Sequence, residues 1–255
     1  MIGPYDLSGS LGKPGAFKDE DVQDAISKVL SSAKKLMNEL KKLNPSQLQE
    51  LMKLSPALAE LNFNRFQAWN TPFNVTNSQP CGWAFSGAAY KGLDFKSMNE
   101  KAKNYAQSTL RILSGLYGFL KPFDLIQPYR LEMGTRLKVD QSSPNLYKFW
   151  GDTITDNLND EIKENEWVVN LASNEYFKSI NISKLKGKLV DCVFKENKNG
   201  EYKIIMSHAK TARGLMSRFI LENFIEEKED LLAFNSSGYM YSPKMSSESE
   251  LVFIR

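Results

Sequence analysis

The first residues that could carry out chemistry lie in the segment RILSGLYGFLKP, residues 111–122, which contains two glycines flanked by cations. Glycine has no Cβ, so a phosphate can approach its backbone, and the N–H groups at a helix start bind anions. Arg111 and Lys121 add positive charge on either side of Gly115 and Gly118. The pattern is typical of a helix-hairpin-helix-like element that meets DNA phosphates. A tight turn between two packed helices is the structural alternative.

Charged residues alternate in a second segment, YRLEMGTR over residues 129–136. Alternate residues of an extended stretch share one face, which would bring Arg130, Glu132 and Arg136 together. Two interpretations stay open. One is a structural arginine–glutamate pair, and the other is an anion-binding cleft in which Glu132 orients an arginine.

A third segment, HAKTARGLMSR over residues 208–218, places Lys210 and Arg213 in the first turn of an expected helix. Positive charge there opposes the helix dipole, and a local rule broken without evident gain is typical of function. We therefore consider phosphate binding by Arg213, against a plain solvent-facing helix start. His208 by itself is more typical of a packed or surface histidine than of a catalyst.

Polar residues follow the expected strand 167–171, in the order Ser173-Asn174-Glu175. Groups just beyond the carboxyl end of a strand often line a site in α/β proteins, although Ser173 could equally cap a helix. Nowhere do a nucleophile, a base and an acid combine into a recognisable set. We accordingly assign no catalytic residue.

The elements that must position these residues are short strands among many helices. Periodicity and cap signals predict helices at 19–42, from Asn44-Pro45, from Ser55-Pro56, from Ser97–Glu100 to about 113, at 145–164 and at 211–223. Strands are predicted at 167–171, at 189–194 and 202–206 around the turn Asn199-Gly200, at 237–241 and at 251–254. This irregular order indicates a mixed α/β (α+β) fold: a single compact domain over residues 1–255 with a central short-stranded sheet.

Composition narrows the function classes. The net charge of +3 is too small to indicate nucleic-acid binding by itself. No apolar run approaches the roughly 20 residues of a membrane helix, and the Gly- and Pro-rich start is not a secretory signal, so a cytoplasmic location without membrane contact is expected. Cys81 and Cys192 are predicted to be free thiols. With one histidine the chain lacks a zinc cluster, so we expect neither metal nor cofactor, and we infer no obligate protein partner.

Five stretches carry a resemblance to a known family: RILSGLYGFLKPFDLIQPYRLEMGTRL, YKFWGDTITDNLN, VVNLASNEYFKSI, AKTARGLMSRFILEN and ELVFIR. The chain resembles the YaaA family of bacterial cytoplasmic proteins from roughly Asn44 onward. The resemblance implies a compact domain with a helix-hairpin-helix-like element and a positively charged cleft. It further implies DNA binding, together with a role in the response to hydrogen peroxide through lowering free intracellular iron. Phosphates carry no base identity, so the expected partner is duplex or branched DNA with little sequence preference.

Carried over to this sequence, the hairpin falls on residues 114–118. The cleft arginines fall on Arg130, Arg136, Arg213 and Arg218. The residues expected at DNA phosphates are Arg111, Ser114, Gly115, Tyr117, Gly118, Lys121, Arg130, Arg136, Lys210, Arg213 and Arg218, with Glu132 and Glu175 as acids of the cleft. The alternative is an enzyme that acts on a phosphorylated or nucleic-acid substrate in the same cleft. A direct iron binder is a third possibility, which the absence of a His/Cys cluster disfavours.

Two departures from the family pattern bear on that alternative. Family members usually open with an apolar strand running into Ser-Pro-Ala-Lys, whereas this chain begins Met1-Ile2-Gly3-Pro4-Tyr5, and residues 1–18 are atypical. Where the family usually has Phe-Lys-Gly-Asp-Val-Tyr, this chain has Ser86 and Ala88 in place of the lysine and the aspartate. The loss of an acid and a base weakens the enzyme interpretation, and the loss of the strand would leave a sheet edge or pocket wall open.

Overall fold

The computed structural model describes residues 20–255, with side chains from residue 30 on. The atypical segment 1–18 lies outside this range. The described residues form two compact units whose segments alternate along the chain: 20–84, 110–154 and 178–180 in unit 1, and 85–109, 155–177 and 181–255 in unit 2. The expectation of one domain over the whole chain stays a prediction. No helix in the described part is both long and apolar enough to cross a membrane.

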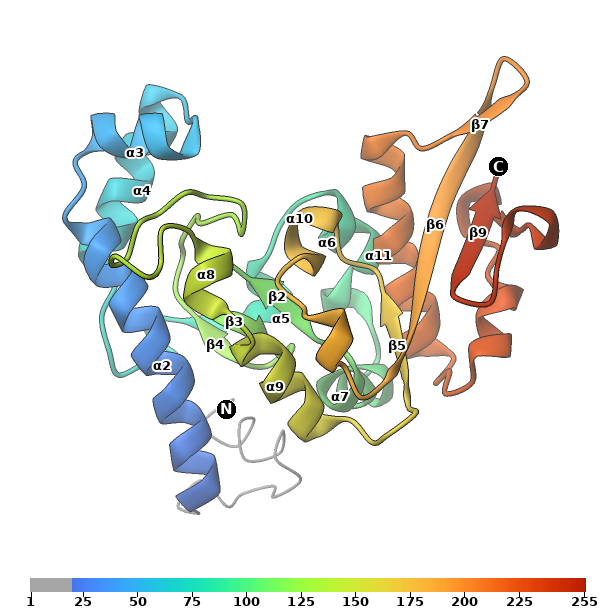
Figure 1. Ribbon diagram of the computed structural model, residues 1–255, viewed down its shortest axis with the longest axis horizontal. Helices are drawn as coiled ribbons and strands as arrows, with labels where there is room; N and C mark the ends of the chain where they lie inside the picture. Colours follow the sequence, from blue (N-terminus) through green and yellow to red (C-terminus); the bar gives the residue numbers. More distant parts are fainter. Residues whose placement is uncertain (1–19) are drawn as a thin grey trace. The chain divides into compact units, whose positions relative to one another are not determined.

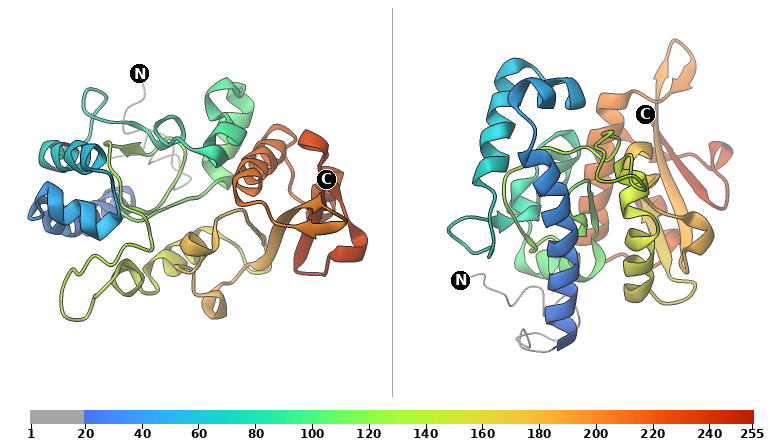
Figure 2. Two further views of the ribbon diagram at one scale, coloured as in Figure 1. Left: turned by 90° about the horizontal axis from the view of Figure 1, so that it is seen from above. Right: turned by 60° about the vertical axis from the view of Figure 1, so that its left-hand side comes forward.

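Unit 1 begins with three helices, α2 (Glu20–Lys41), α3 (Pro45–Met52) and α4 (Pro56–Ala68). The local signals that predicted them are present as hydrogen bonds. Asn44 and Gln47 form a reciprocal capping box, and the Ser55 side chain accepts the Leu58 N–H. Figures 1 and 2 show α3 and α4 lying side by side.

The rest of unit 1 contains two short antiparallel strand pairs and two short helices. β1 (Gln79–Pro80) pairs with β4 (Leu125–Ile126), and β2 (Ile112–Ser114) pairs with β3 (Gly118–Leu120). α5 (Cys81–Ala84) follows β1, and α8 (Leu146–Trp150) follows the strands. Gly151 has a positive φ of 49°, and it divides the helix expected over 145–164 into α8 and α9 (Thr153–Glu161).

Unit 2 is a small sheet with helices packed on it. The strand order is β5-β6-β9-β8, with β7 paired to β6, and the strands are β5 (Trp167–Asn170), β6 (Lys188–Lys198), β7 (Glu201–Lys203), β8 (Met240–Tyr241) and β9 (Glu250–Ile254). β5, β6 and β9 run parallel, and β8 runs antiparallel to β9. The predicted turn at Asn199-Gly200 is confirmed, because both residues have the positive φ that a tight hairpin needs.

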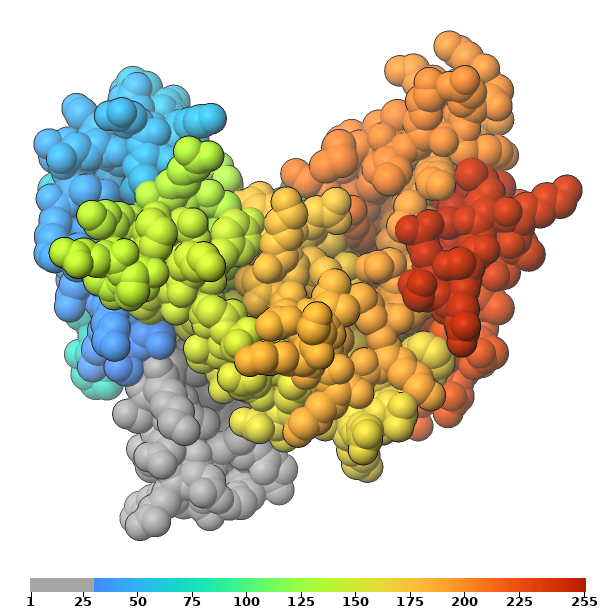
Figure 3. All heavy atoms as spheres, viewed as in Figure 1, coloured from blue at the N-terminus to red at the C-terminus, as the bar shows by residue number. Residues whose placement is uncertain are grey.

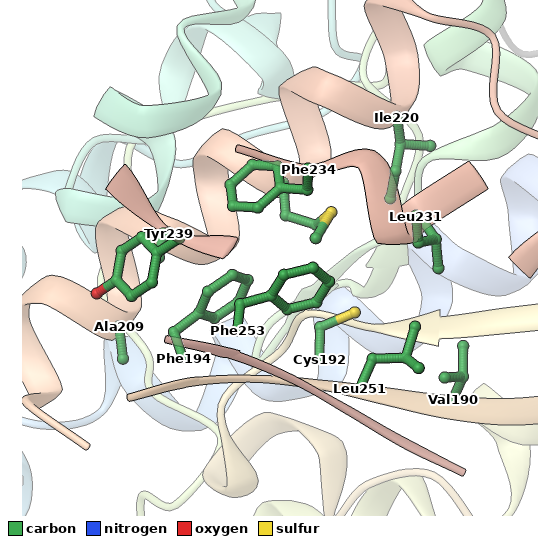
Figure 4. Packing of buried hydrophobic residues seen from close by; sticks show 12 residues of the cluster. Val190, Cys192, Phe194, Ala209, Ile220, Leu231, Phe234, Tyr239, Leu251 and Phe253 are labelled. Atoms are coloured by element: carbon green, nitrogen blue, oxygen red, sulfur yellow. The ribbon is translucent and has the colours of Figure 1, made fainter. Parts of the chain in front are cut away.

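The helices of unit 2 are α6 (Ala88–Leu93), α7 (Glu100–Thr109), α10 (Asn174–Phe177) and α11 (Met206–Glu222), with 3₁₀ turns at Phe95–Ser97, Ile182–Lys184, Lys228–Ala233, Ser236–Gly238 and Pro243–Met245. α11 packs along the sheet and buries Ala209, Ala212, Met216 and Ile220 against it. Figure 4 shows the aromatic part of this core, where Phe194 and Phe253 of the sheet face Phe234 and Tyr239. This packing fixes which face of α11 remains open to ligands.

Candidate functional site

The segment 111–122 is a β-hairpin, so the prediction of a helix-hairpin-helix-like element is wrong. α7 ends at Thr109, and the chain then forms β2 and β3 with Ile112 opposite Leu120 and Ser114 opposite Gly118. Gly118 has a positive φ of 76°, as the turn between antiparallel strands requires. A Gly-rich turn follows a helix in both arrangements, and the apolar residues on both sides of it pair here as strands.

The turn of this hairpin is buried. Ser114 is 1% exposed and Tyr117 is 2% exposed, and Gly115 and Gly118 are buried as well. The indole of Trp150 donates a hydrogen bond of 3.0 Å to the carbonyl of Gly115, and its ring lies 3.0 Å from where a Cβ on Gly118 would be. The glycines therefore permit close packing inside unit 1. In this structure none of these four residues presents its backbone to a ligand.

Two cations flank the hairpin. Lys121 is only 4% exposed. Its backbone N–H donates a hydrogen bond of 2.8 Å to the carboxylate of Asp124. Arg111 is half-buried and donates to the carbonyl of Leu110 over 3.0 Å. Lys121 is thus placed inside unit 1, away from where a DNA phosphate could reach it in this conformation.

The segment YRLEMGTR, residues 129–136, lies on the surface of unit 1, and buried and exposed residues alternate along it. Leu131, Met133, Thr135 and Leu137 are buried, and the residues between them are exposed. Arg130 and Glu132 form an ion pair of 2.7 Å, in which both side chains remain about half exposed. Arg136 and Lys138 are exposed and form no ion pair within residues 30–255. The alternation expected from the sequence is therefore present, and Arg130 and Glu132 form the arginine–glutamate pair of the first interpretation. The anion-binding cleft stays a prediction.

Arg218 of α11 is engaged within unit 2. Its guanidinium donates to the carbonyl of Asp94 over 3.1 Å, to the Ser97 hydroxyl over 2.8 Å and to the carboxylate of Glu222 over 2.7 Å. These contacts connect α11 to the segment after α6. With two carboxylates beside it, Arg218 has little uncompensated charge for a phosphate.

Arg213, on the same helix, has a different environment. It is half-buried, and burial lowers the pKa of its guanidinium. Within residues 30–255 no carboxylate forms an ion pair with it. Lys210 lies three residues before it, is exposed, and also forms no ion pair in the described part of the chain. Residues three apart on a helix share a face, so the two cations lie together.

Glu196 is the acid of unit 2 that the sequence did not reveal. A single oxygen, Oε1, accepts from the Tyr239 hydroxyl over 2.8 Å, from Arg255 over 2.9 Å and pairs with His208 Nδ1 over 2.8 Å. Burial raises the pKa of Glu196, but these hydrogen bonds and the Arg255 charge together hold it below its usual value. These contacts of Glu196 connect β6, α11 and the end of the chain. They give His208 a structural role.

The remaining sequence candidates are divided between the units. Glu175 lies in α10 of unit 2 and is half-buried, whereas Glu132 belongs to unit 1. Asn174 is the first residue of α10, and the carbonyl of Ser173 accepts the N–H of Phe177 over 2.8 Å. The expected phosphate contacts accordingly form two sets: Arg111, Arg130 and Arg136 with the buried hairpin residues in unit 1, and Lys210, Arg213 and Arg218 in unit 2.

The cysteines are free and buried, as predicted. Burial raises the pKa of the Cys81 thiol well above its ordinary value and that of Cys192 to about 12, with Asp124 and Asp191 respectively adding to the effect. Both side chains are therefore inert thiols in the folded protein. In the described part of the chain no three His, Cys, Asp or Glu residues are grouped closely enough to hold a metal ion.

Comparisons with known proteins identify the family. A family model described as "Peroxide stress protein YaaA" matches residues 10–245. The chain belongs to this family. It is 50% identical over 231 residues to a UPF0246 protein of Marinomonas sp. (strain MWYL1), covering 91% of this chain and 88% of the relative. A UPF0246 protein of Idiomarina loihiensis is 48% identical over 230 residues, which is 89% of each chain. YaaA family membership thus extends across both units.

Proposed function

We propose that this YaaA family protein binds DNA through its phosphates, with little sequence preference. The observation that supports it best is Arg213, a half-buried guanidinium without a carboxylate partner among residues 30–255. Taking a charge out of water costs free energy unless an opposite charge and hydrogen bonds compensate it. A bound oxyanion supplies both.

The chemistry of Arg213 suits phosphate better than other ligands. A guanidinium offers planar, paired N–H groups that match two oxygens of a phosphate or carboxylate. Lys210 on the same face adds a second positive charge next to it. No aromatic or amide side chain is required by this arrangement, so it recognises charge and geometry and carries no base information.

Unit 1 contributes exposed cations to the same activity. Arg136 and Lys138 extend from one surface segment and have no ion pair within residues 30–255. Arg130 belongs to the same segment, and Glu132 offsets its charge. Each such cation neutralises a phosphate and releases counterions. The buried β2–β3 hairpin has no part in this proposal.

Binding of a fluorescent duplex and of a four-way junction across a salt series tests the proposal. We expect similar affinity for unrelated sequences and a linear fall of log affinity with log salt, at a slope of about −0.9 per phosphate contacted. Arg213→Gln should weaken binding and reduce the slope by about 0.9. Lys203→Gln is the matched control, because it removes one positive charge of unit 2 from an exposed side chain already paired with Glu201.

Two outcomes would change the proposal. No binding to either DNA at low salt would exclude it. If a mononucleotide or a sugar phosphate displaced DNA at equimolar phosphate, and bound alone in an Arg213-dependent way, the enzyme alternative with a phosphorylated substrate would be favoured.

We further infer that the protein limits peroxide damage by lowering free intracellular iron. This inference is supported by the family description, which names peroxide stress, together with the resemblance of the motifs. Deleting the gene should raise chelatable iron and peroxide sensitivity. Complementation with the wild type should restore both, and complementation with Arg213→Gln should restore neither if DNA binding and the iron effect are linked. Equal iron levels with and without the gene would refute this part.

A further inference from the structure

One face of α11 carries an oxidisable side chain beside the candidate phosphate contacts. Met206 is the first residue of the helix, and Lys210 and Arg213 follow four and seven residues later. Side chains at these spacings lie one above the other on a helix. The thioether of Met206 therefore begins the same stripe that offers its positive charges to a phosphate.

Met206 is unusually accessible for a methionine of this chain. It is 61% exposed, whereas Met216, which packs into the core of unit 2, is 0% exposed. In the described part of the chain only Met240, at 64%, is comparably open, while Met37, Met98 and Met133 are buried. Met206 also ends an exposed apolar stretch that includes Tyr202 and Ile204. Figure 3 shows the hairpin that leads into this stretch projecting from its surroundings.

We propose that Met206 is a site of reversible oxidation by hydrogen peroxide that weakens phosphate binding on α11. The proposal rests on the proposed function, because the affinity it alters is that of Lys210 and Arg213 for DNA phosphates. In the reaction Met206 Sδ attacks one peroxide oxygen, an S–O bond forms and the O–O bond breaks. The departing hydroxide takes up the proton of the bound oxygen and leaves as water. Sulfur loses two electrons, and peroxide gains them.

The consequence follows from the polarity of the product. Oxidation converts an apolar thioether into a sulfoxide with a strong hydrogen-bond acceptor. Lys210, one turn later and without an ion pair among the side chains of residues 30–255, is the nearest donor along the stripe. Ile205, at the N-cap, offers no side-chain acceptor, so the first N–H groups of α11 are further donors for the new oxygen. A phosphate must then displace the sulfoxide oxygen from each donor that this oxygen engages.

The expected effect on affinity is modest and measurable. A single hydrogen bond of this kind contributes enough to shift a binding constant by about threefold to tenfold. We therefore expect DNA affinity to fall by at least about threefold when Met206 is fully oxidised. Methionine sulfoxide reductases should restore it, because they return the sulfoxide to the thioether.

The test treats the folded full-length protein with hydrogen peroxide, removes the peroxide with catalase, and follows each methionine by peptide mass spectrometry. DNA affinity is measured before and after treatment for the wild type, Met206→Leu and Met240→Leu. Met206 and Met240 should gain one oxygen long before Met216. The wild type and Met240→Leu should lose affinity, whereas Met206→Leu should keep the affinity it had before treatment.

A second readout separates this proposal from the proposed function. Acylation of lysine amines, measured in the same peptide maps, should slow at Lys210 after oxidation and stay constant at Lys203. Met206→Leu should show no such change. If the untreated protein does not bind DNA, the proposed function fails, and the acylation result alone then decides whether the sulfoxide engages Lys210. Oxidation of Met216 as fast as Met206, or unchanged acylation of Lys210, would overturn the proposal.

Discussion

The close approach of α6 to α11 depends on two glycines, Gly92 of α6 and Gly214 of α11, which is next to Arg213. A Cβ added to Gly214 would lie 2.7 Å from the backbone nitrogen of Leu93, 2.8 Å from the carbonyl carbon of Ala89, and closer still to the Ala89 oxygen. Ordinary contact begins at 3.4 Å, so α6 would have to move by at least about 0.7 Å to admit a methyl group. The atoms involved are backbone, so no side-chain rotamer change can relieve the clash.

Gly214→Ala should therefore destabilise unit 2. Replacing a mid-helix glycine by alanine gains about 1 kcal/mol of helix propensity, and overpacking costs about 1–3 kcal/mol, more where backbones collide. We expect the free energy of unfolding to fall by about 1–2 kcal/mol. Urea unfolding with an unchanged m-value measures it, and Ser207→Ala, at an exposed position of α11, is the control for a substitution to alanine without the clash. A Gly214→Ala protein as stable as the wild type would refute the packing argument.

Three further predictions concern stability and reactivity. Glu196→Gln should lower the free energy of unfolding by about 1 kcal/mol near neutral pH, since the hydrogen bonds of Glu196 favour the carboxylate. Because the pKa of Glu196 is lowered in the folded state, this contribution is present above the unfolded-state pKa and is lost as pH falls through the folded-state pKa. The stabilities of wild type and variant should therefore converge in acid. Cys81 and Cys192 should resist a thiol reagent in the native protein and both react in denaturant without reductant, whereas rapid native labelling would contradict their burial. Gly115→Ala should lower the melting temperature, because its Cβ would lie 3.1 Å from the carbonyl carbon of Leu131 and nearer to the oxygen; a fully stable variant would contradict the observed packing.

Sequence reasoning succeeded where the signal is local. The starts of α3 and α4 depend on Asn44 and Ser55 as caps followed by proline, and these contacts span three residues. The turn at Asn199-Gly200 is likewise local: both residues have a positive φ, and the Asn197 side chain accepts the Gly200 N–H over 2.9 Å. The start of α7 was displaced slightly, since Asn99 rather than Ser97 accepts the N–H of Ala102.

It failed where distant residues decide. Residues 111–122 carry a Gly-rich turn that fits either two helices or two strands, and the segment alone does not show that Trp150, 35 residues away, donates to Gly115. The ion pairs of α11 could not be predicted from the sequence either. Arg213 and Arg218 look alike in the sequence, yet only Arg218 meets Asp94 and Glu222 in the fold.

The claim that Arg213 binds a DNA phosphate is tested most directly by NMR of the arginine Nε–H groups. Titration of the labelled protein with a short duplex should shift the Arg213 Nε–H resonance, which Arg213→Gln identifies by its absence. It should also slow the exchange of that proton with water. Arg218, already bonded to Ser97 and Glu222, should be unaffected. A duplex that binds while the Arg213 resonance stays unchanged would contradict the account.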